Sequence, residues 1–285
     1  MSPGQYELLD FGEGEKLESF AGTIVRRETP SAIGRRSPND QWNGFDLRGS
    51  QTGKRYGWQG NPPDPWWFDV GSFRLELRPT PTGQLGVFPE QAVNWKWIND
   101  ASLDLSGLRA INLFAYTGAT TLALASRGAH VAHVDAAKSV VNWARSNARN
   151  SGLEQAPIRW IVEDALTFVQ REIKRGNGYD IVVADPPSFG RGPKGELWKL
   201  QLDLDQLMES LALLTAGNCR MMLVSCHTPG IDHVALERSA KRVSDFRLGR
   251  SESFELSIKS AGGKQLPSGS CFRWMAESCG ANLES

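Results

Sequence analysis

Acidic side chains stand at the ends of three predicted strands in the second part of this 285-residue chain: Asp135, Asp164 and Asp185. An earlier apolar run ends in a turn that contains Gly118. The carboxyl ends of parallel strands meet at one edge of a sheet, and this edge is where open α/β sheets bind ligands. A glycine turn lets the backbone approach a ligand, and a carboxylate can accept hydrogen bonds from ribose hydroxyls or an amine. The pattern therefore predicts a cofactor crevice.

Asp185 opens the run Asp185-Pro186-Pro187-Ser188-Phe189, directly after the apolar stretch 181–184. Because proline has no amide hydrogen and a fixed φ angle, a Pro-Pro pair cannot continue a strand ladder. The chain must leave the sheet here, which places the Asp185 carboxylate beside the crevice. A rigid turn with no chemical role is the structural alternative.

Asp135 and Asp164 also have a structural alternative, because aspartate is a favoured N-cap residue for a following helix. Any one of the acids taken alone is explained in this way. Their recurrence at successive strand ends favours a shared site. The dinucleotide fingerprint G-x-G-x-x-G is absent after the first strand, which argues against a nicotinamide or flavin dehydrogenase.

After residue 88, short apolar runs alternate with longer helical patterns. This alternation is typical of a doubly wound parallel sheet, whose strands and helices would position these residues. We expect strands at 110–114, 130–134, 158–162, 179–184 and 220–225, and two last strands at 246–256 and 271–275. We expect helices at 90–99, 120–127, 137–150, 164–174, 197–214 and 229–243. Residues 1–88 are rich in Gly, Pro, Trp and Arg and predict a small β-rich module, which leaves 89–285 for the α/β domain.

Composition is that of an ordinary globular chain, with 40% hydrophobic and 22% charged residues. The 32 basic and 32 acidic side chains cancel, so any nucleic-acid surface must be local. No apolar run approaches the length of a membrane span, and we expect a cytoplasmic protein that contacts no membrane. The four cysteines lack the spacing of a zinc site, and no metal is expected.

The stretch INLFAYTGATTLALASRGAHVAHVD, followed by DPPSFGRG and LVSCH, resembles the class I S-adenosylmethionine-dependent methyltransferases. Within them it is similar to the branch of bacterial 23S ribosomal RNA cytosine-5 methyltransferases and their uncharacterised relatives. The resemblance implies a Rossmann-like seven-stranded sheet and S-adenosylmethionine as cofactor. It implies cofactor contacts from the glycine turn to the methionine part, from Asp135 to the ribose and from Asp164 to the adenine. The full cofactor set is Phe114, Tyr116, Thr117, Gly118, Asp135, Asp164, Ala165 and Asp185.

The resemblance also implies a catalytic pair, with Cys226 as nucleophile and Asp185 holding the polar edge of the pyrimidine. A thiolate adding to carbon 6 makes carbon 5 nucleophilic enough to take the methyl group. Substrate contacts are expected from Gln91, Pro186, Pro187, Ser188, Phe189 and Arg191. The partner is expected to be RNA, with ribosomal RNA as the favoured class. Ser188 and His227 depart from the lysine and serine of characterised relatives.

Three alternatives stay open at this point. Cys226 could be a buried apolar side chain, as cysteines often are. The acceptor could be an exocyclic amine or a small molecule, with no covalent intermediate. The chain could also be an inactive RNA-binding protein with this fold. The amino-terminal module mixes basic and aromatic residues suited either to phosphates and bases or to an ordinary core and surface: Arg26, Arg27, Arg35, Arg36, Lys54 and Arg55 with Trp42, Tyr56, Trp58, Trp66 and Trp67.

Overall fold

The computed structural model describes residues 4–38, 40–53, 55–191, 197–215, 217–243 and 249–277. Its central sheet has seven strands in the order β10-β9-β8-β11-β14-β16-β15. β8 to β11 and β14 are mutually parallel where they pair, and β16 is antiparallel to β14 and β15. The strands are β8 (Arg109–Leu113), β9 (His130–Asp135), β10 (Ile158–Val162), β11 (Ile181–Ala184), β14 (Met221–Cys226), β15 (Gly249–Lys259) and β16 (Gln265–Ala276).

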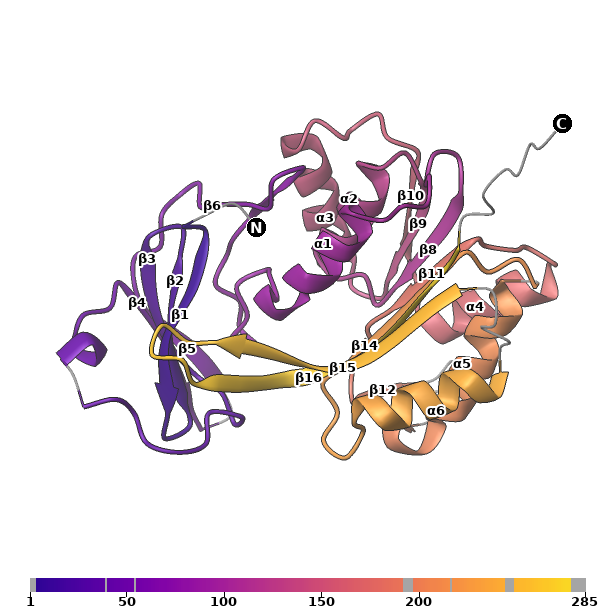
Figure 1. The fold of residues 1–285 in the computed structure, drawn as a ribbon. Coiled ribbons are helices and arrows are strands. Elements are labelled where there is room, and N and C mark those ends of the chain that lie inside the picture. Colours follow the sequence, from indigo (N-terminus) through magenta and orange to yellow (C-terminus); the bar gives the residue numbers. More distant parts are fainter. Residues whose placement is uncertain are drawn as a thin grey trace, which may run out of the picture.

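Helices cover both faces of this sheet, three on each (Figure 1). One face carries α1 (Ala92–Asn99), α2 (Ala119–Ala125) and α3 (Lys138–Asn150), and the other carries α4 (Ala165–Lys174), α5 (Leu200–Leu214) and α6 (His233–Val243). The connection changes direction between β8 and β11, so the loops after these two neighbouring strands diverge and leave a crevice. Within the described ranges, no helix is long and apolar enough to cross a membrane.

The predicted Rossmann-like seven-stranded sheet is confirmed, and the expected elements differ from the observed ones mainly at their ends. The first expected helix begins with a 3-10 turn, η2 (Pro89–Gln91), before α1. The start of the expected helix at 197–214 is instead a short strand, β13 (Leu197–Lys199), which pairs with β12 (Phe189–Arg191). Cys226 is the last residue of β14 and does not lie beyond the strand.

A separate five-stranded sheet forms the amino-terminal part, in the order β1-β2-β3-β4-β5. Its strands are β1 (Tyr6–Gly12), β2 (Glu15–Phe20), β3 (Thr23–Glu28), β4 (Leu47–Thr52) and β5 (Arg55–Gly60), and a 3-10 turn η1 (Asp40–Asn43) precedes β4. The short pair β6 (Trp67–Asp69) and β7 (Arg74–Glu76) leads on to the central sheet. The predicted β-rich character of this segment is thus confirmed, while the boundary at residue 88 stays a prediction.

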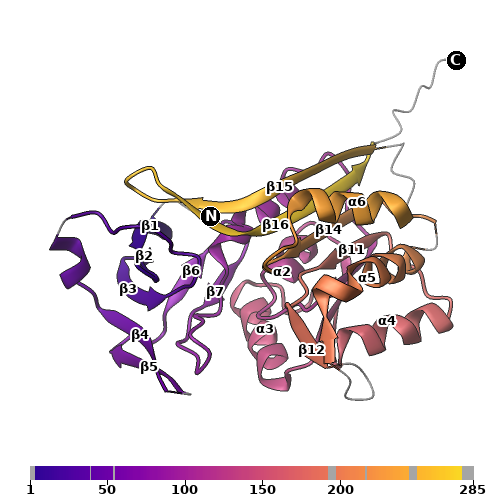
Figure 2. The same ribbon diagram turned by 90° about the horizontal axis from the view of Figure 1, so that it is seen from below.

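The long hairpin of β15 and β16 runs from the central sheet to the amino-terminal sheet (Figures 1 and 2). At its tip, Ser260 forms a bridge with Leu8 of β1, and the Ala261 amide donates to the Leu8 carbonyl at 2.8 Å. Lys264 of the same tip forms an ion pair with the buried Asp10 at 2.5 Å. The hairpin therefore holds the two sheets in a defined arrangement.

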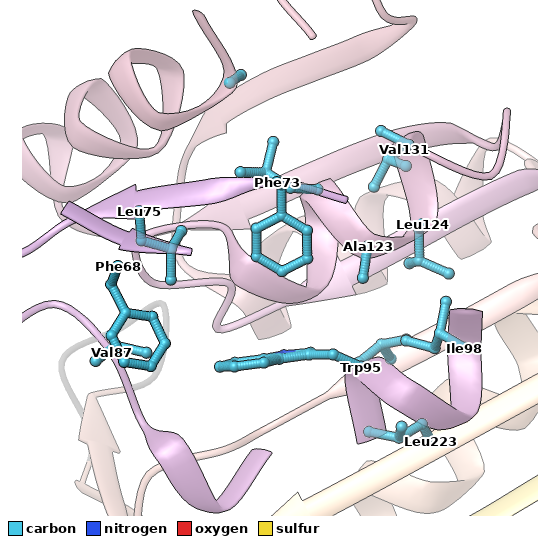
Figure 3. Close-up of a cluster of buried hydrophobic side chains, with 14 of the residues drawn as sticks. Phe68, Phe73, Leu75, Val87, Trp95, Ile98, Ala123, Leu124, Val131 and Leu223 are labelled. Carbon is cyan, nitrogen blue, oxygen red and sulfur yellow. The ribbon is translucent and has the colours of Figure 1, made fainter. Parts of the chain in front are cut away.

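One hydrophobic core also crosses from the amino-terminal part to the central sheet. Phe68 and Leu75 of β6 and β7 belong to the same cluster as Trp95 of α1 and Leu223 of β14 (Figure 3). The Phe73 and Trp95 rings pack edge to face with centroids 6.0 Å apart. Because a buried aromatic side chain contributes roughly 1.5–3 kcal/mol, this shared core resists movement of one part against the other.

Glu18 is a fully buried carboxylate in the amino-terminal sheet. It forms ion pairs with Arg27 at 2.6 Å and Lys16 at 3.0 Å, and it accepts a hydrogen bond from Tyr6 Oη at 2.8 Å. Burial alone opposes the charged carboxylate, but Arg27 and Lys16 outweigh it and lower the pKa of Glu18 to about 2.

This depressed pKa predicts acid destabilisation. The contribution of Glu18 to stability is present above the ordinary glutamate pKa and is lost as pH falls towards about 2. We expect the free energy of unfolding to fall by on the order of 2 kcal/mol from this group between pH 6 and pH 2, measured by urea denaturation. A Glu18→Gln variant, which cannot titrate there, should lose less stability over the same range; equal losses in both proteins would contradict the assignment.

Candidate active site

A cavity of about 580 Å³ lies at the crevice between the carboxyl ends of β8 and β11. Most of the predicted site residues line it together: Gln91, Phe114, Tyr116, Thr117, Asp135, Asp164, Ala165, Asp185, Pro186 and Pro187. These residues come from five different segments, so the fold assembles the site from positions far apart in the sequence. Its volume is within the roughly 300–1,000 Å³ range of small-molecule sites.

The turn after β8 has a strained backbone. Phe114 and Tyr116 have φ angles of 56° and 49°, in the left-handed region that non-glycine residues seldom adopt, and Gly118 has a φ of 90°. Thr117 fixes the turn, because its hydroxyl donates to the Gly86 carbonyl at 2.6 Å. A Cβ at position 118 would also stand 3.1 Å from Ala144 Cβ. Gly118 does not line the cavity itself, and its positive φ and its close approach to Ala144 both favour glycine at this position.

Asp135 holds the same turn from the end of β9. Its Oδ2 accepts from the Tyr116 amide and its Oδ1 from the Ala137 amide, both at 2.9 Å. It is not the N-cap of α3, because Ala137 occupies that position. A carboxylate has about four acceptor positions, so two remain for a ligand in the cavity.

Asp164 is the N-cap of α4, as the structural alternative supposed. Its Oδ1 accepts from the Thr167 amide and the Thr167 hydroxyl, both at 2.8 Å. Its side chain also lines the cavity beside Ala165, which leaves Oδ2 for a ligand. Capping and ligand binding are therefore compatible at this residue.

Asp185 is held by two side chains on the wall of the cavity. The Ser225 hydroxyl donates to its Oδ1 at 2.8 Å, and Gln91 Nε2 donates to its Oδ2 at 3.2 Å. Gln91 Oε1 in turn accepts from Asn94 Nδ2 at 2.7 Å, and Asn94 Oδ1 accepts from Arg273 at 3.3 Å. Because arginine can only donate, this chain fixes the orientation of both amides and presents a donor to Asp185.

Ser225 and Asn94 are missing from the sequence-based set. Ser225 could have been found, because Ser225 and Cys226 are successive strand residues and point to opposite faces. Asn94 lies on α1, and its pairing with Gln91 depends on a tertiary contact that no local pattern indicates.

Cys226 lies on the opposite face of β14 from Ser225. It is fully buried, within the cluster of α5 and α6 that includes Ile231, Leu236 and Phe272, and it does not line the cavity. Burial raises the pKa of its thiol to about 11, although a backbone hydrogen bond from Thr228 acts in the other direction. The structure therefore does not bring Cys226 to the cavity as a thiolate, which is the opposite of what the predicted nucleophile requires.

His227, the next residue, points into the site instead. Its Nε2 lies 3.7 Å from Asp185 Oδ1 and its Nδ1 lies 3.9 Å from Glu90 Oε1. Burial favours the neutral ring, but the hydrogen bond and charge of Asp185, together with Glu90, outweigh it and raise the pKa of His227 to about 9. The imidazole is therefore a cation at neutral pH.

Ser188 and Phe189 are not among the residues that line this cavity. Ser188 accepts a hydrogen bond from the Thr228 hydroxyl at 3.0 Å, and Phe189 is 64% exposed on β12. The side chain of Arg191 and residues 192–196 lie outside the described residues. Phe88 and His227 line both this cavity and a larger groove of about 1270 Å³ between the amino-terminal sheet and the β15–β16 hairpin.

Three arginines of the amino-terminal module are engaged within the fold. Arg26 and Arg36 pair with Glu15, and Arg27 pairs with Glu18. For these three arginines the structural alternative holds. Trp42 and Trp66 are buried, Arg35 and Arg55 are exposed, and Lys54 lies outside the described residues.

Comparison with known proteins gives a consistent result. The sequence model of a family described as S-adenosylmethionine-dependent methyltransferase matches residues 54–254. A crystal structure of an S-adenosylmethionine-dependent methyltransferase from Agrobacterium tumefaciens superimposes with a TM-score of 0.86 and 33% identity over 95% of this chain and 90% of that one. A putative methyltransferase complexed with S-adenosylhomocysteine (SAH) has the same fold, with a TM-score of 0.74 and 16% identity over 97% of this chain and 76% of that one.

Among curated sequences, the ribosomal RNA large subunit methyltransferase K/L of Shewanella frigidimarina is 31% identical over 150 residues. The match covers 51% of this chain and 20% of that protein, so the chain spans about a fifth of the length of this relative.

Proposed function

The chain belongs to the S-adenosylmethionine-dependent methyltransferase family, and from this premise we propose that it methylates an amine nitrogen of a base in RNA. The observation that carries the proposal is the opposite orientation of Asp185 and Cys226. Asp185 lines the cavity, whereas Cys226 is buried on the other face of the sheet.

The cofactor is S-adenosylmethionine, and the donor set of the cavity fits it. Asp135 keeps acceptor positions for the two ribose hydroxyls, and Asp164 keeps one for the adenine amine. Phe114 supplies an apolar ring for the adenine, and the turn at Tyr116 and Thr117 faces the methionine part. When bound, the cofactor supplies an electrophilic methyl group.

Asp185 would position the acceptor nitrogen. Its two oxygens already accept from Ser225 and Gln91, which fixes the plane of the carboxylate and leaves lone pairs for an N–H of the acceptor. Accepting that N–H would hold the nitrogen in one orientation beside the bound cofactor, and such positioning would favour methyl transfer. The nitrogen–carbon bond forms as the carbon–sulfur bond breaks, with its electron pair leaving on sulfur.

The surplus proton of the methylated amine leaves through a carboxylate. His227 cannot accept it at neutral pH, because Asp185 and Glu90 overcome the effect of burial and keep its pKa at about 9. Asp185 is in hydrogen-bonding reach of the same nitrogen and can pass the proton to water.

RNA is the acceptor class that the relatives support. The matched curated proteins are named ribosomal RNA large subunit methyltransferases, although this chain spans only a fifth of the first of them. An amine on an exposed RNA base agrees both with this acceptor class and with the position of the Asp185 carboxylate in the cavity.

Replacing the cysteine separates this proposal from the covalent route. We expect the Cys226→Ala variant to methylate RNA from a strain lacking the protein at a rate within about twofold of wild type. Its stability should fall by roughly 1 kcal/mol, because a small buried side chain is removed. Labelled cofactor followed by mass spectrometry of the digested RNA identifies the methylated atom.

Two results would contradict the proposal. One is loss of methylation in Cys226→Ala while SAH still binds to the variant. The other is a covalent adduct between the wild-type protein and RNA containing 5-fluorocytosine. Either would restore carbon 5 of cytosine as the acceptor and Cys226 as the nucleophile.

A further inference from the structure

Two aromatic rings stand at the junction of the cofactor cavity and the larger groove. Phe88 and His227 line both spaces, so anything that reaches the cofactor from the groove passes between or beside them. Their ring centroids are 6.2 Å apart and their planes are inclined by only 31°.

This spacing is close to that of an aromatic slot. A planar ring stacked between two others needs about 7 Å between the outer rings, twice a contact distance of ~3.5 Å. A base can therefore enter between these rings only if they move apart, by about 1 Å or more. His227 has 37% of its side chain exposed, so part of the ring is open to solvent.

Both walls of the slot are supported from behind. Phe88 packs against Tyr116 with centroids 5.1 Å apart. On the other side, Gly269 has a φ of 124°, and a Cβ there would stand 2.9 Å from His227 Nδ1. Because a Cβ there would also stand 2.5 Å from the Cys226 carbonyl oxygen, glycine at this position lets β16 pass close to both the backbone of Cys226 and the imidazole.

Two carboxylates flank one edge of the slot. Glu90 Oε1 lies 3.9 Å from His227 Nδ1 and Asp185 Oδ1 lies 3.7 Å from Nε2, so one carboxylate stands near each ring nitrogen. A ring stacked on His227 would present its edge to these acceptors. Adenine, cytosine and guanine carry an exocyclic amine on that edge, whereas uracil carries carbonyl oxygens on both sides of its single N–H.

We propose that Phe88 and His227 form a slot for a single extruded base, and that Glu90 and Asp185 select an amino-bearing base over uracil. The inference rests on the proposed function for the identity of the acceptor as RNA, and it adds the class of base and the residues that choose it. Extruding one base from its neighbours is the general solution for enzymes that modify bases. A protonated His227 adds a cation–π contact to the stacking.

Binding of short oligonucleotides tests the slot without requiring methyl transfer. The probes are the four trinucleotides UAU, UCU, UGU and UUU, titrated by calorimetry into the full chain saturated with SAH. We expect UUU to bind at least about tenfold more weakly than each of the other three, because one good edge contact discriminates by roughly 1–3 kcal/mol. NMR should show the ring protons of His227 shifting upfield with the three that bind.

Three variants define the outcome. Phe88→Leu should weaken binding of the amino-bearing trinucleotides by about tenfold, since base stacking contributes roughly 1–3 kcal/mol. Glu90→Gln should reduce the difference between UUU and the others, because an amide can donate to a uracil carbonyl. Glu154→Gln, an exposed acid paired with Arg149 away from both cavities, is the matched control and should change nothing.

The proposed base slot would be contradicted by equal affinity for all four trinucleotides, or by an unchanged preference in the Glu90→Gln variant. The test is distinct from that of the proposed function. If the trinucleotides bind with the expected preference but no methylated nitrogen is found in RNA, the slot stands and the proposed function fails. If a methylated nitrogen is found but the trinucleotides bind equally, the proposed function stands and the slot fails.

Discussion

The Asp185→Asn variant is expected to transfer methyl groups about 10²- to 10⁴-fold more slowly than wild type, while SAH binds with an affinity within about twofold. Asparagine keeps the shape of the side chain but turns one acceptor into a donor. In wild type the Gln91 amide and the Ser225 hydroxyl both donate to Asp185. The new donor of asparagine would therefore face one of these donors or the amine of the acceptor. Transfer to RNA is measured with labelled cofactor, and SAH binding by calorimetry.

A spectroscopic readout shows whether the substitution acts at the site or through unfolding. Asp185 is the main group that raises the pKa of His227 against the effect of burial, so the pKa of the imidazole should fall from about 9 towards or below its ordinary value in Asp185→Asn. NMR titration of the histidine ring measures this change. Asp100→Asn, which removes an exposed carboxylate paired with Lys96, serves as control and should alter neither the rate nor the titration. Full activity in Asp185→Asn would remove Asp185 from the reaction.

The order of strands and helices could be predicted because local patterns determine it. The helical spacing of Leu200, Leu204, Leu207, Leu211 and Leu214 indicates a buried face, and four of them are buried while Leu204 is half-buried. The acids at strand ends converge because parallel strands share an edge, a rule that needs no tertiary information. Hence the wall formed by Asp135, Asp164 and Asp185 was accessible from the sequence.

The parts of the site that the sequence does not indicate depend on the face to which a strand residue points and on contacts between distant segments. Cys226 occupies the expected position in the sequence, yet a one-residue difference in a strand decides which face a side chain meets. The amide pair Asn94 and Gln91 takes its orientation from Arg273, about 180 residues away in the chain. The slot at Phe88 and His227 likewise needs Gly269 of the last strand. None of these pairings leaves a local signal.

Asp135→Ala is the substitution expected to weaken cofactor binding most. The variant loses both acceptor positions for the ribose hydroxyls, and hydrogen bonds to a charged group contribute roughly 1.5–3 kcal/mol each. It also leaves the amides of Tyr116 and Ala137 without their carboxylate partner, so the strained turn with Tyr116 at a φ of 49° loses its support. We expect the Kd for SAH to rise by about 100-fold or more, measured by calorimetry.

Asp135→Asn separates the two contributions. Asparagine can still accept from the Tyr116 amide through its one carbonyl oxygen and so retains part of the support of the turn, but it offers fewer acceptors to the ribose. Its Kd for SAH should lie between those of wild type and Asp135→Ala, and its melting temperature without ligand should stay close to that of wild type. Asp69→Ala, which breaks an exposed ion pair with Arg74, should leave the Kd unchanged. If Asp135→Ala were folded and bound SAH within threefold of wild type, the ribose would have to be held elsewhere.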